Sequence, residues 1–194
     1  MNRTEAFILA GGASSRMGTD KSQLLIEGET FVERIATTLF KVVGKVTIVG
    51  RESKDPRCAS VADLFPKWGA LGGLHAALAA CQSEWALVAA CDLPFIRAEL
   101  LERIASLREG FDAVVPRQAD GRPQPLVGIY RVAPCRDKAA ELIQANKRRP
   151  LDLLESVQTR WLPFSEIKDL DHAEEFFVNI NTREDYYEAT QKGT

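Results

Sequence analysis

Short, nearly unbroken apolar runs alternate along this chain with longer stretches in which apolar residues recur every three or four positions. The first pattern predicts buried strands and the second predicts amphipathic helices. We expect strands at 7–9, 24–26, 46–49, 61–62, 85–91, 112–116, within 120–130 and at 160–164. We expect helices at 31–43, 75–81, 97–107, 131–147, from 151 onward and at 183–190. This alternation predicts one three-layer α/β domain over residues 1–194, built on a mainly parallel sheet.

Two stretches carry the strongest local signals. Thr30 and Glu33 form a T-x-x-E capping box, which indicates that a helix begins directly after Thr30. The run at 85–91 is apolar at nearly every position, which is typical of a strand covered on both faces of a parallel sheet. We therefore expect 85–91 at the centre of the sheet.

The composition adds exclusions rather than a function. The chain has 194 residues, of which 45% are hydrophobic and 27% are charged, and its formal net charge is −2. A nucleic-acid-binding protein usually has a strongly basic balance, so we expect no nucleic-acid partner. The sequence contains no signal-peptide pattern and no apolar run of about 18 residues, so we expect no membrane association and a cytoplasmic location.

The cysteines and histidines do not suggest a metal site. The four cysteines form no C-x-x-C pair, and we expect them to be reduced, buried thiols. His75 and His172 have no sequence neighbours that indicate a triad or a metal centre, so we interpret them as structural or solvated.

The first strand is followed by a glycine-rich stretch with two cationic residues. Small residues leave backbone N–H groups accessible to phosphate oxygens, while Arg16 and Lys21 supply positive charge. The stretch has neither the G-x-x-x-x-G-K-[ST] pattern nor G-x-G-x-x-G. It is therefore either an ordinary strand-to-helix connection with solvated cations or a phosphate-binding loop of another kind. As a nucleotide-binding loop it would use Leu9, Ala10, Gly11, Gly12 and Lys21.

A second glycine-rich stretch, 69–73, precedes the helix expected at 75–81. Gly69 and Gly73 would let a flat base or a ribose lie close to the backbone. The alternative is a helix start that packs closely against a strand.

Asp92 directly follows the strand at 85–91, and Pro94 ends that strand. Open α/β sheets bind their ligands at the carboxyl ends of strands, and a carboxylate suits Mg²⁺ when phosphate oxygens complete its coordination. Asp92 is thus the candidate magnesium ligand. Its alternative role is to cap the helix at 97–107.

Two groups of polar residues near the carboxyl terminus are candidates for contacting a phosphate-bearing substrate. Basic residues end the helix at 131–147 and continue past it, where they also suit the helix dipole. We expect two asparagines farther on to lie two residues apart on a strand, where they project to one face. The candidates are Lys147, Arg148, Arg149, Asn179 and Asn181.

The string LAGGASSRMGTDK at 9–21 resembles the signature of nucleotidyltransferases related to molybdenum cofactor guanylyltransferase. The resemblance continues at 69–73, where Ala70 replaces the proline of the family's G-P-L-x-G, at Asp92, and in the D-G-x-x-x-P-L segment at 120–126. It ends at 178–185, which matches the family's V-N-[IV]-N-T-x-E-[ED]. It therefore implies the Rossmann-like nucleotidyltransferase fold over nearly the whole chain.

The resemblance also implies an activity: transfer of GMP from GTP to molybdopterin cofactor with release of pyrophosphate. It implies that Asp92 holds Mg²⁺, that Asp63 contacts the nucleotide, and that Arg16 and Lys21 stabilise charge on the leaving pyrophosphate. Lys21, Arg16 and Asp92 are then the catalytic residues. The partners implied are GTP, molybdopterin cofactor, and the proteins that supply the cofactor and receive the product.

Two alternatives to guanylyl transfer stay open. One is cytidylyl transfer to molybdopterin cofactor, or nucleotidyl transfer to another phosphorylated acceptor. Gly11 speaks against the cytidylyl form, because those enzymes usually have alanine there. Val49 leaves it open, because guanylyltransferases often have asparagine at that position. The other alternative is a catalytically silent nucleotide-binding protein, which would have no chemical need to keep both Lys21 and Asp92.

Overall fold

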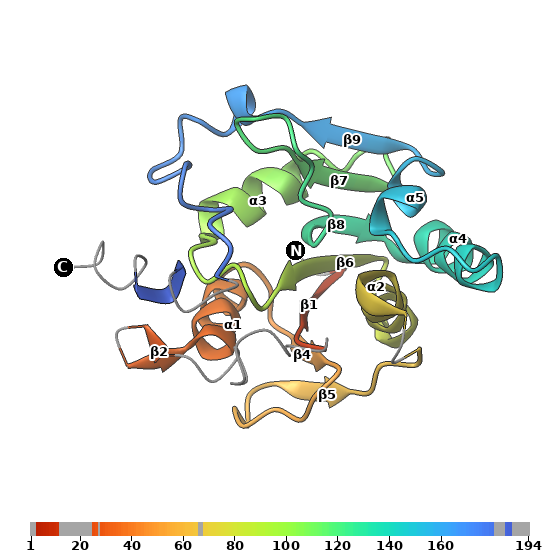
Figure 1. Cartoon of the computed structure of the whole chain (residues 1–194), viewed down its shortest axis with the longest axis horizontal. Coiled ribbons are helices and arrows are strands. Elements are labelled where there is room, and N and C mark those ends of the chain that lie inside the picture. Colours follow the sequence, from red (N-terminus) through yellow and green to blue (C-terminus); the bar gives the residue numbers. More distant parts are fainter. Residues whose placement is uncertain (1–2, 12–24, 27, 66–67, 181–184, 188–194) are drawn as a thin grey trace.

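The computed structural model describes residues 3–11, 25–26, 28–65, 68–180 and 185–187. Within them, a seven-stranded sheet has the order β5-β4-β1-β6-β8-β7-β9 (Figure 1). Its strands are β1 (Thr4–Leu9), β4 (Val46–Val49), β5 (Ala59–Val61), β6 (Trp85–Ala90), β7 (Ala113–Pro116), β8 (Val127–Arg131) and β9 (Thr159–Leu162). A separate antiparallel ribbon pairs β2 (Leu25–Ile26) with β3 (Glu29–Thr30).

The sheet is mainly parallel, as the sequence predicts, with one reversed strand. β1 pairs in parallel with β4 and with β6, and β4 pairs in parallel with β5. β8 runs antiparallel to both of its neighbours, β6 and β7, and β7 pairs in parallel with β9. All six residues of β6 are buried, which agrees with the central position predicted for this strand.

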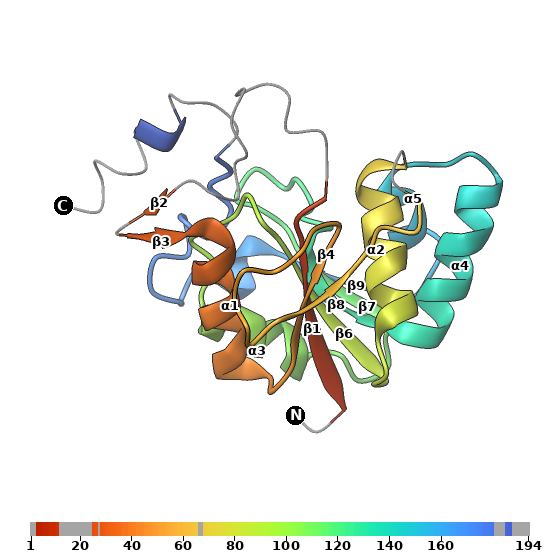
Figure 2. The same ribbon diagram turned by 90° about the horizontal axis from the view of Figure 1, so that it is seen from below.

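Helices cover both faces of the sheet and make three layers (Figure 2). One face carries α1 (Phe31–Val42) and α3 (Ala98–Ser106), and the other carries α2 (Gly69–Ala80), α4 (Val132–Gln144) and α5 (Pro150–Leu154). Alternate residues of the strands point to opposite faces. In β1, Ala6 and Ile8 therefore join the core under α1 and α3, while Phe7 and Leu9 join the core under α2 and α4.

Local chemistry explains where α1 begins. The hydroxyl of Thr30 accepts a hydrogen bond from the Glu33 N–H at 3.2 Å, and Oε2 of Glu33 accepts one from the Thr30 N–H at 2.8 Å. Both halves of the predicted capping box are thus present. Phe31, Ile35 and Leu39 are fully buried beneath the helix.

The prediction of a loop at 69–73 is wrong, because α2 already begins at Gly69. Glycines weaken a helix intrinsically, but tertiary packing overrides that preference. Leu71, Leu74 and Leu78 recur at helical spacing and are all fully buried. Burial of this stripe against the sheet extends the helix through the glycines.

The expected strand that carries Asn179 is also absent from the described residues, where 171–177 form turns. Burial explains the difference, since Phe176 and Phe177 are adjacent and both buried, whereas a half-buried strand alternates. Asn181 lies outside the described residues. Ile180 ties the end of this segment to the carboxyl end of β6, because its N–H donates to the Asp92 carbonyl at 3.1 Å.

The cysteines agree with the prediction of reduced thiols. All four are free, with Cys58 and Cys135 buried and Cys81 and Cys91 half-buried. Burial raises the pKa of Cys81 to about 11 and that of Cys135 to about 12. Among the described residues, no helix is long and apolar enough to cross a membrane.

Candidate functional site

The candidate site lies where the parallel strands β1, β4, β5 and β6 end. Backbone hydrogen bonds join these ends just beyond the strands: Ala10 N–H to Val49 O at 3.0 Å, Gly50 N–H to Val61 O at 2.9 Å, and Cys91 N–H to Leu9 O at 3.1 Å. The start of the glycine-rich stretch and the residue before Asp92 are therefore fixed side by side. Carboxyl ends of parallel strands are where open α/β sheets bind ligands.

Two glycines bring the backbones of neighbouring strand ends close together at this edge. Gly50 has a φ of +86°, which L side chains rarely adopt. A Cβ at position 50 would lie 2.6 Å from the Cα of Gly11 and 2.9 Å from its nitrogen. Sequence reasoning selected Gly11 and missed Gly50. The signal available in the sequence was that Gly50 directly follows the strand at 46–49, which is the next long apolar strand after the one that leads into the glycine-rich loop.

The cationic half of the loop lies outside the residues that the structure describes. Gly12, Arg16 and Lys21 belong to this part, so their predicted roles are untested by the structure. Leu9 is buried, Ala10 is half-buried and Gly11 is exposed. The described portion of the loop thus leads outward from the core toward solvent.

Asp63 organises the connection that leads from β5 to α2. Its Oδ1 accepts a hydrogen bond from the Phe65 N–H at 2.8 Å. The connection packs against Gly72, where a Cβ would lie 2.8 Å from the Phe65 carbonyl oxygen and 2.9 Å from the Trp68 Cβ. Gly72 is thus the glycine that packing requires here, and the sequence analysis did not select it.

The two glycines that the sequence analysis did select in α2 are in open positions. Gly69 is exposed, has a φ of +62° and starts the helix, and Gly73 is half-buried. A Cβ built on either would meet nothing within 4 Å in the described structure. A ligand could therefore approach the backbone at both positions.

Asp92 is half-buried at the carboxyl end of β6. Its main chain is fixed by the Ile180 N–H, and within the described part of the chain its carboxylate has no hydrogen-bond donor. It does not cap α3, whose N-cap is Arg97 with no side-chain capping bond. No three His, Cys, Asp or Glu side chains gather into a metal-binding group among the described residues. A single carboxylate nevertheless fits Mg²⁺ shared with phosphates, because that ion typically takes one or two protein carboxylates and completes its shell with phosphate and water oxygens.

The described acceptor candidates belong to two segments on opposite faces of the sheet, one directly after α4 and the other around 176–180 (Figure 2). Lys147, Arg148 and Arg149 follow α4, and the first two contact Trp68, the residue before α2. The Trp68 indole N–H donates to the Lys147 carbonyl at 3.0 Å, and the Arg148 guanidinium lies 4.8 Å from the Trp68 ring centroid. Asn179 is exposed and follows Phe176 and Phe177, which pack in the core under α1 and α3, and it precedes the Ile180 whose N–H contacts Asp92. The structure thus brings only Asn179 close to Asp92.

Val49, where the family often has asparagine, is 1% exposed and packs in the core under α2. Its side chain offers no polar contact and points away from solvent. Base recognition at this strand end is therefore left to other groups.

The histidines have structural or solvated environments, as the sequence analysis expects. His75 is buried in α2 and meets the Phe65 ring edge to face at 5.3 Å between centroids. Burial lowers the pKa of His75, because it disfavours the charged form of the ring. His172 is exposed and lies 3.3 Å from Glu175.

Comparison with known proteins gives a consistent family. The sequence model of the MobA-like NTP transferase domain matches residues 6–159. A protein of Pelotomaculum thermopropionicum named "Probable molybdenum cofactor guanylyltransferase" is 34% identical, covering 97% of this chain and 93% of its own. A protein with the same name from Carboxydothermus hydrogenoformans is 31% identical over 96% of this chain and 94% of its own.

Solved structures agree on the fold. Molybdopterin-guanine dinucleotide biosynthesis protein A from Archaeoglobus fulgidus superposes with a TM-score of 0.82 at 26% identity, covering 97% of this chain and 98% of its own. The 2-C-methyl-D-erythritol 4-phosphate cytidylyltransferase of Thermus thermophilus gives a TM-score of 0.71 at 14% identity, covering 96% and 97%. At 14% identity the second likeness concerns the fold alone.

Proposed function

This chain belongs to the MobA-like NTP transferase family, and from that premise we propose that it transfers GMP from GTP to molybdopterin cofactor. Relatives that share about a third of its residues over nearly its full length are named for this activity. The observation that carries the proposal in the structure is the bond between Cys91 N–H and Leu9 O. It fixes the start of a phosphate-loop sequence next to the carboxylate that follows β6.

The proposed donor site lies over β1, β4 and the start of α2. The backbone of 9–12 adjoins the triphosphate, with the N–H groups from Gly11 onward as its donors, because the Ala10 N–H already donates to Val49 O. The open backbone at Gly69 and Gly73 faces the nucleoside. Asp63 contributes a carboxylate, of which one oxygen already accepts from the Phe65 N–H. Arg16 and Lys21 provide positive charge for the phosphates. Arg16 does so through the planar fork of donors on its guanidinium, and Lys21 through the mobile point charge of its ammonium group.

We assign the magnesium ion to Asp92. When bound, Mg²⁺ neutralises phosphate charge and acts as a Lewis acid. Asp92 suits this task because its main chain is anchored by Ile180 and its carboxylate has no competing donor in the described structure. The protein's share is to hold the carboxylate in place before substrates arrive.

In the proposed reaction, an oxygen of the acceptor's phosphate attacks the α-phosphorus of GTP. A new P–O bond forms as the bond from that phosphorus to the oxygen bridging the α- and β-phosphates breaks, and that electron pair leaves with pyrophosphate. The protein forms no covalent bond, so its contribution is alignment and stabilisation of charge. Lys21 and Arg16 stabilise the charge that gathers on pyrophosphate.

Asn179 contacts the acceptor near Asp92, with Asn181 two residues farther along the sequence. The run 147–149 is a second group of acceptor candidates.

The test has two steps. Calorimetric titration with GTP, CTP, ATP and UTP, with and without Mg²⁺, should give clear preference for GTP and tighter binding with the ion. Purified protein, GTP, Mg²⁺ and molybdopterin cofactor, kept anaerobic, should then yield the guanine dinucleotide and pyrophosphate in equal amounts. Preference for CTP, or binding without any transfer, contradicts the proposal.

A further inference from the structure

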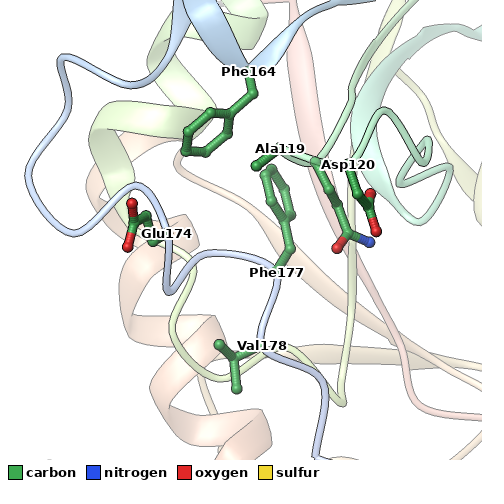
Figure 3. Close-up of a pocket in the computed structure, with 7 residues that line it drawn as sticks. Ala119, Asp120, Phe164, Glu174, Phe177 and Val178 are labelled. Atoms are coloured by element: carbon green, nitrogen blue, oxygen red, sulfur yellow. The ribbon is translucent and has the colours of Figure 1, made fainter.

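A pocket of about 330 Å³ lies beyond the carboxyl ends of β7 and β9 (Figure 3). Three segments line it: the connection from β7 to β8, the start of the stretch after β9, and the segment 174–178. It is at the small end of the range for ligand pockets. Its lining residues are Gln118, Ala119, Asp120, Phe164, Glu174, Phe177 and Val178. The sequence analysis assigned no role to any of them, although Asp120 and Val178 lie in the segments 120–126 and 178–185 that resemble the family.

The pocket has two aromatic side chains, Phe164 and Phe177, which approach each other from different segments in Figure 3. Phe177 is held firmly, because it is 8% exposed and packs edge to face on the fully buried Phe176 at 6.3 Å between centroids. Rigid aromatic surfaces suit a flat ring system, which they can contact with little loss of conformational entropy.

The stretch that carries Phe164 is also tied down. Arg103 of α3 donates to the Glu166 carbonyl at 2.6 Å and to the Asp169 carboxylate at 2.9 Å. Arg160 of β9 donates to both carboxylate oxygens of Glu166, at 2.9 and 2.8 Å. The pocket wall is thus formed before any ligand enters.

Only one of the two carboxylates at the pocket is available to a ligand. Asp120 is engaged, since its Oδ1 accepts from the Arg122 N–H at 3.0 Å and its Oδ2 pairs with the Arg122 guanidinium at 2.5 Å. Glu174 is exposed, and within the described part of the chain no donor contacts its carboxylate. It therefore offers two oxygens that can accept a pair of parallel N–H bonds.

The pocket adjoins the proposed reaction centre on the side away from the donor loop. Val178 is two residues from Ile180, whose N–H bonds to Asp92, and two residues span at most about 7 Å. In the sheet order, Asp92 follows β6, the glycine loop follows β1 on one side, and the pocket belongs to β7 and β9 on the other. A substrate in the pocket would thus face GTP across Asp92.

We propose that this pocket holds the pterin ring of the acceptor, with Glu174 accepting hydrogen bonds from its ring N3–H and its 2-amino group. The inference rests on the proposed function and adds the position of the pterin. Guanine has the same pair of adjacent donors on one edge, so the shared chemistry is a 2-amino-4-oxopyrimidine edge. The location of the pocket beyond β6 assigns it to the acceptor's pterin.

The test compares Glu174→Gln with Glu175→Gln. Glutamine presents a donor where two acceptors are needed, so Glu174→Gln should raise KM for molybdopterin about tenfold, as expected for loss of a charged hydrogen-bonding partner. Its kcat and its KM for GTP should stay within about twofold of the parent values. Glu175 is a matched control, because it is exposed, lies outside the pocket lining and pairs with His172 at 3.3 Å. Glu175→Gln should behave as the parent.

Two outcomes of the kinetic comparison overturn the pterin assignment. Equal KM values for molybdopterin in both variants exclude a role for Glu174, although GMP transfer by the parent would still support the proposed function. A raised KM for GTP alone assigns the pocket to guanine. If the parent transfers no GMP, the proposed function fails, and a fluorescence titration with pterin-6-carboxylate tests the pocket by itself. Binding that Glu174→Gln weakens and Glu175→Gln retains supports the pocket, and equal or absent binding contradicts it.

Discussion

The contact between Gly50 and Gly11 leads to a prediction that isolates one packing feature of the site. In Gly50→Ala, the new methyl group is placed 2.6 Å from the Gly11 Cα and 2.9 Å from its nitrogen. Both atoms belong to backbone, so no side chain can rotate away. The ends of β1 and β4 must separate, although the Ala10 N–H to Val49 O bond holds them together at 3.0 Å.

Two costs add in this variant. An L residue in the left-handed region costs about 1–2 kcal/mol, and forced overpacking costs about 1–3 kcal/mol more. We expect Gly50→Ala to lower the free energy of unfolding by about 2–5 kcal/mol. Gly110→Ala is the matched control: Gly110 has a φ of +83°, and a Cβ there meets nothing within 4 Å. It should show only the first cost.

Urea unfolding followed by circular dichroism measures both variants against the parent, and GTP titration reports the effect on the loop. Gly50→Ala should be the less stable variant by at least about 1 kcal/mol, and it should bind GTP more weakly. Equal losses of stability in the two variants would show that the approach of the two backbones contributes nothing beyond the φ requirement. That result would refute the reasoning.

Three further predictions concern single side chains. Asp92→Ala and Lys21→Ala should each lower turnover at least about a hundredfold, which is the scale for loss of one preorganised stabilising group. A folded variant that releases pyrophosphate at the normal rate contradicts the role assigned to that residue. Burial lowers the pKa of His75 below its ordinary 6.5 in the folded protein. The stability linked to the neutral ring is therefore fully present above about pH 6.5, and it is lost as the pH falls through the lower pKa of the folded state. Urea unfolding at about pH 7.5 and 5.5 should therefore show a larger acid loss for the parent than for His75→Leu. Tyr130→Phe should cost about 1–2 kcal/mol in urea unfolding, because the fully buried hydroxyl donates to the Pro125 carbonyl, and an unchanged midpoint counts against that bond.

Much of the fold could be predicted because local pattern and tertiary packing agree. The capping box at Thr30 is confirmed, and the apolar run beginning at Trp85 forms the central strand β6. The start of α2 could not be read from propensity, since glycines at 69, 72 and 73 favour a loop while the buried leucines around them favour a helix. Only the sheet against which those leucines pack decides between the two.

The site was predictable where chemistry follows directly from a strand end. Asp92 lies at the edge of the sheet as its position after an apolar run indicates. Gly50 and Gly72 were missed because their importance comes from contacts with residues distant in sequence or across a connection. The pocket residues were missed for the same reason, since Gln118, Phe164 and Glu174 come together only through the topology.

The reversed direction of β8 explains where the chain places the pocket and the basic run 147–149. In a purely parallel sheet, each strand would be followed by a crossover, and the chain would leave the carboxyl edge at once. Because β8 runs antiparallel to β7, the connection 117–126 stays at that edge and supplies Gln118 and Asp120 to the pocket. For the same reason α4, which follows β8, begins at the opposite edge and delivers the run 147–149 to the side of α2 where Trp68 lies. One change of strand direction thus produces both the pocket on one side of Asp92 and the basic run on the other.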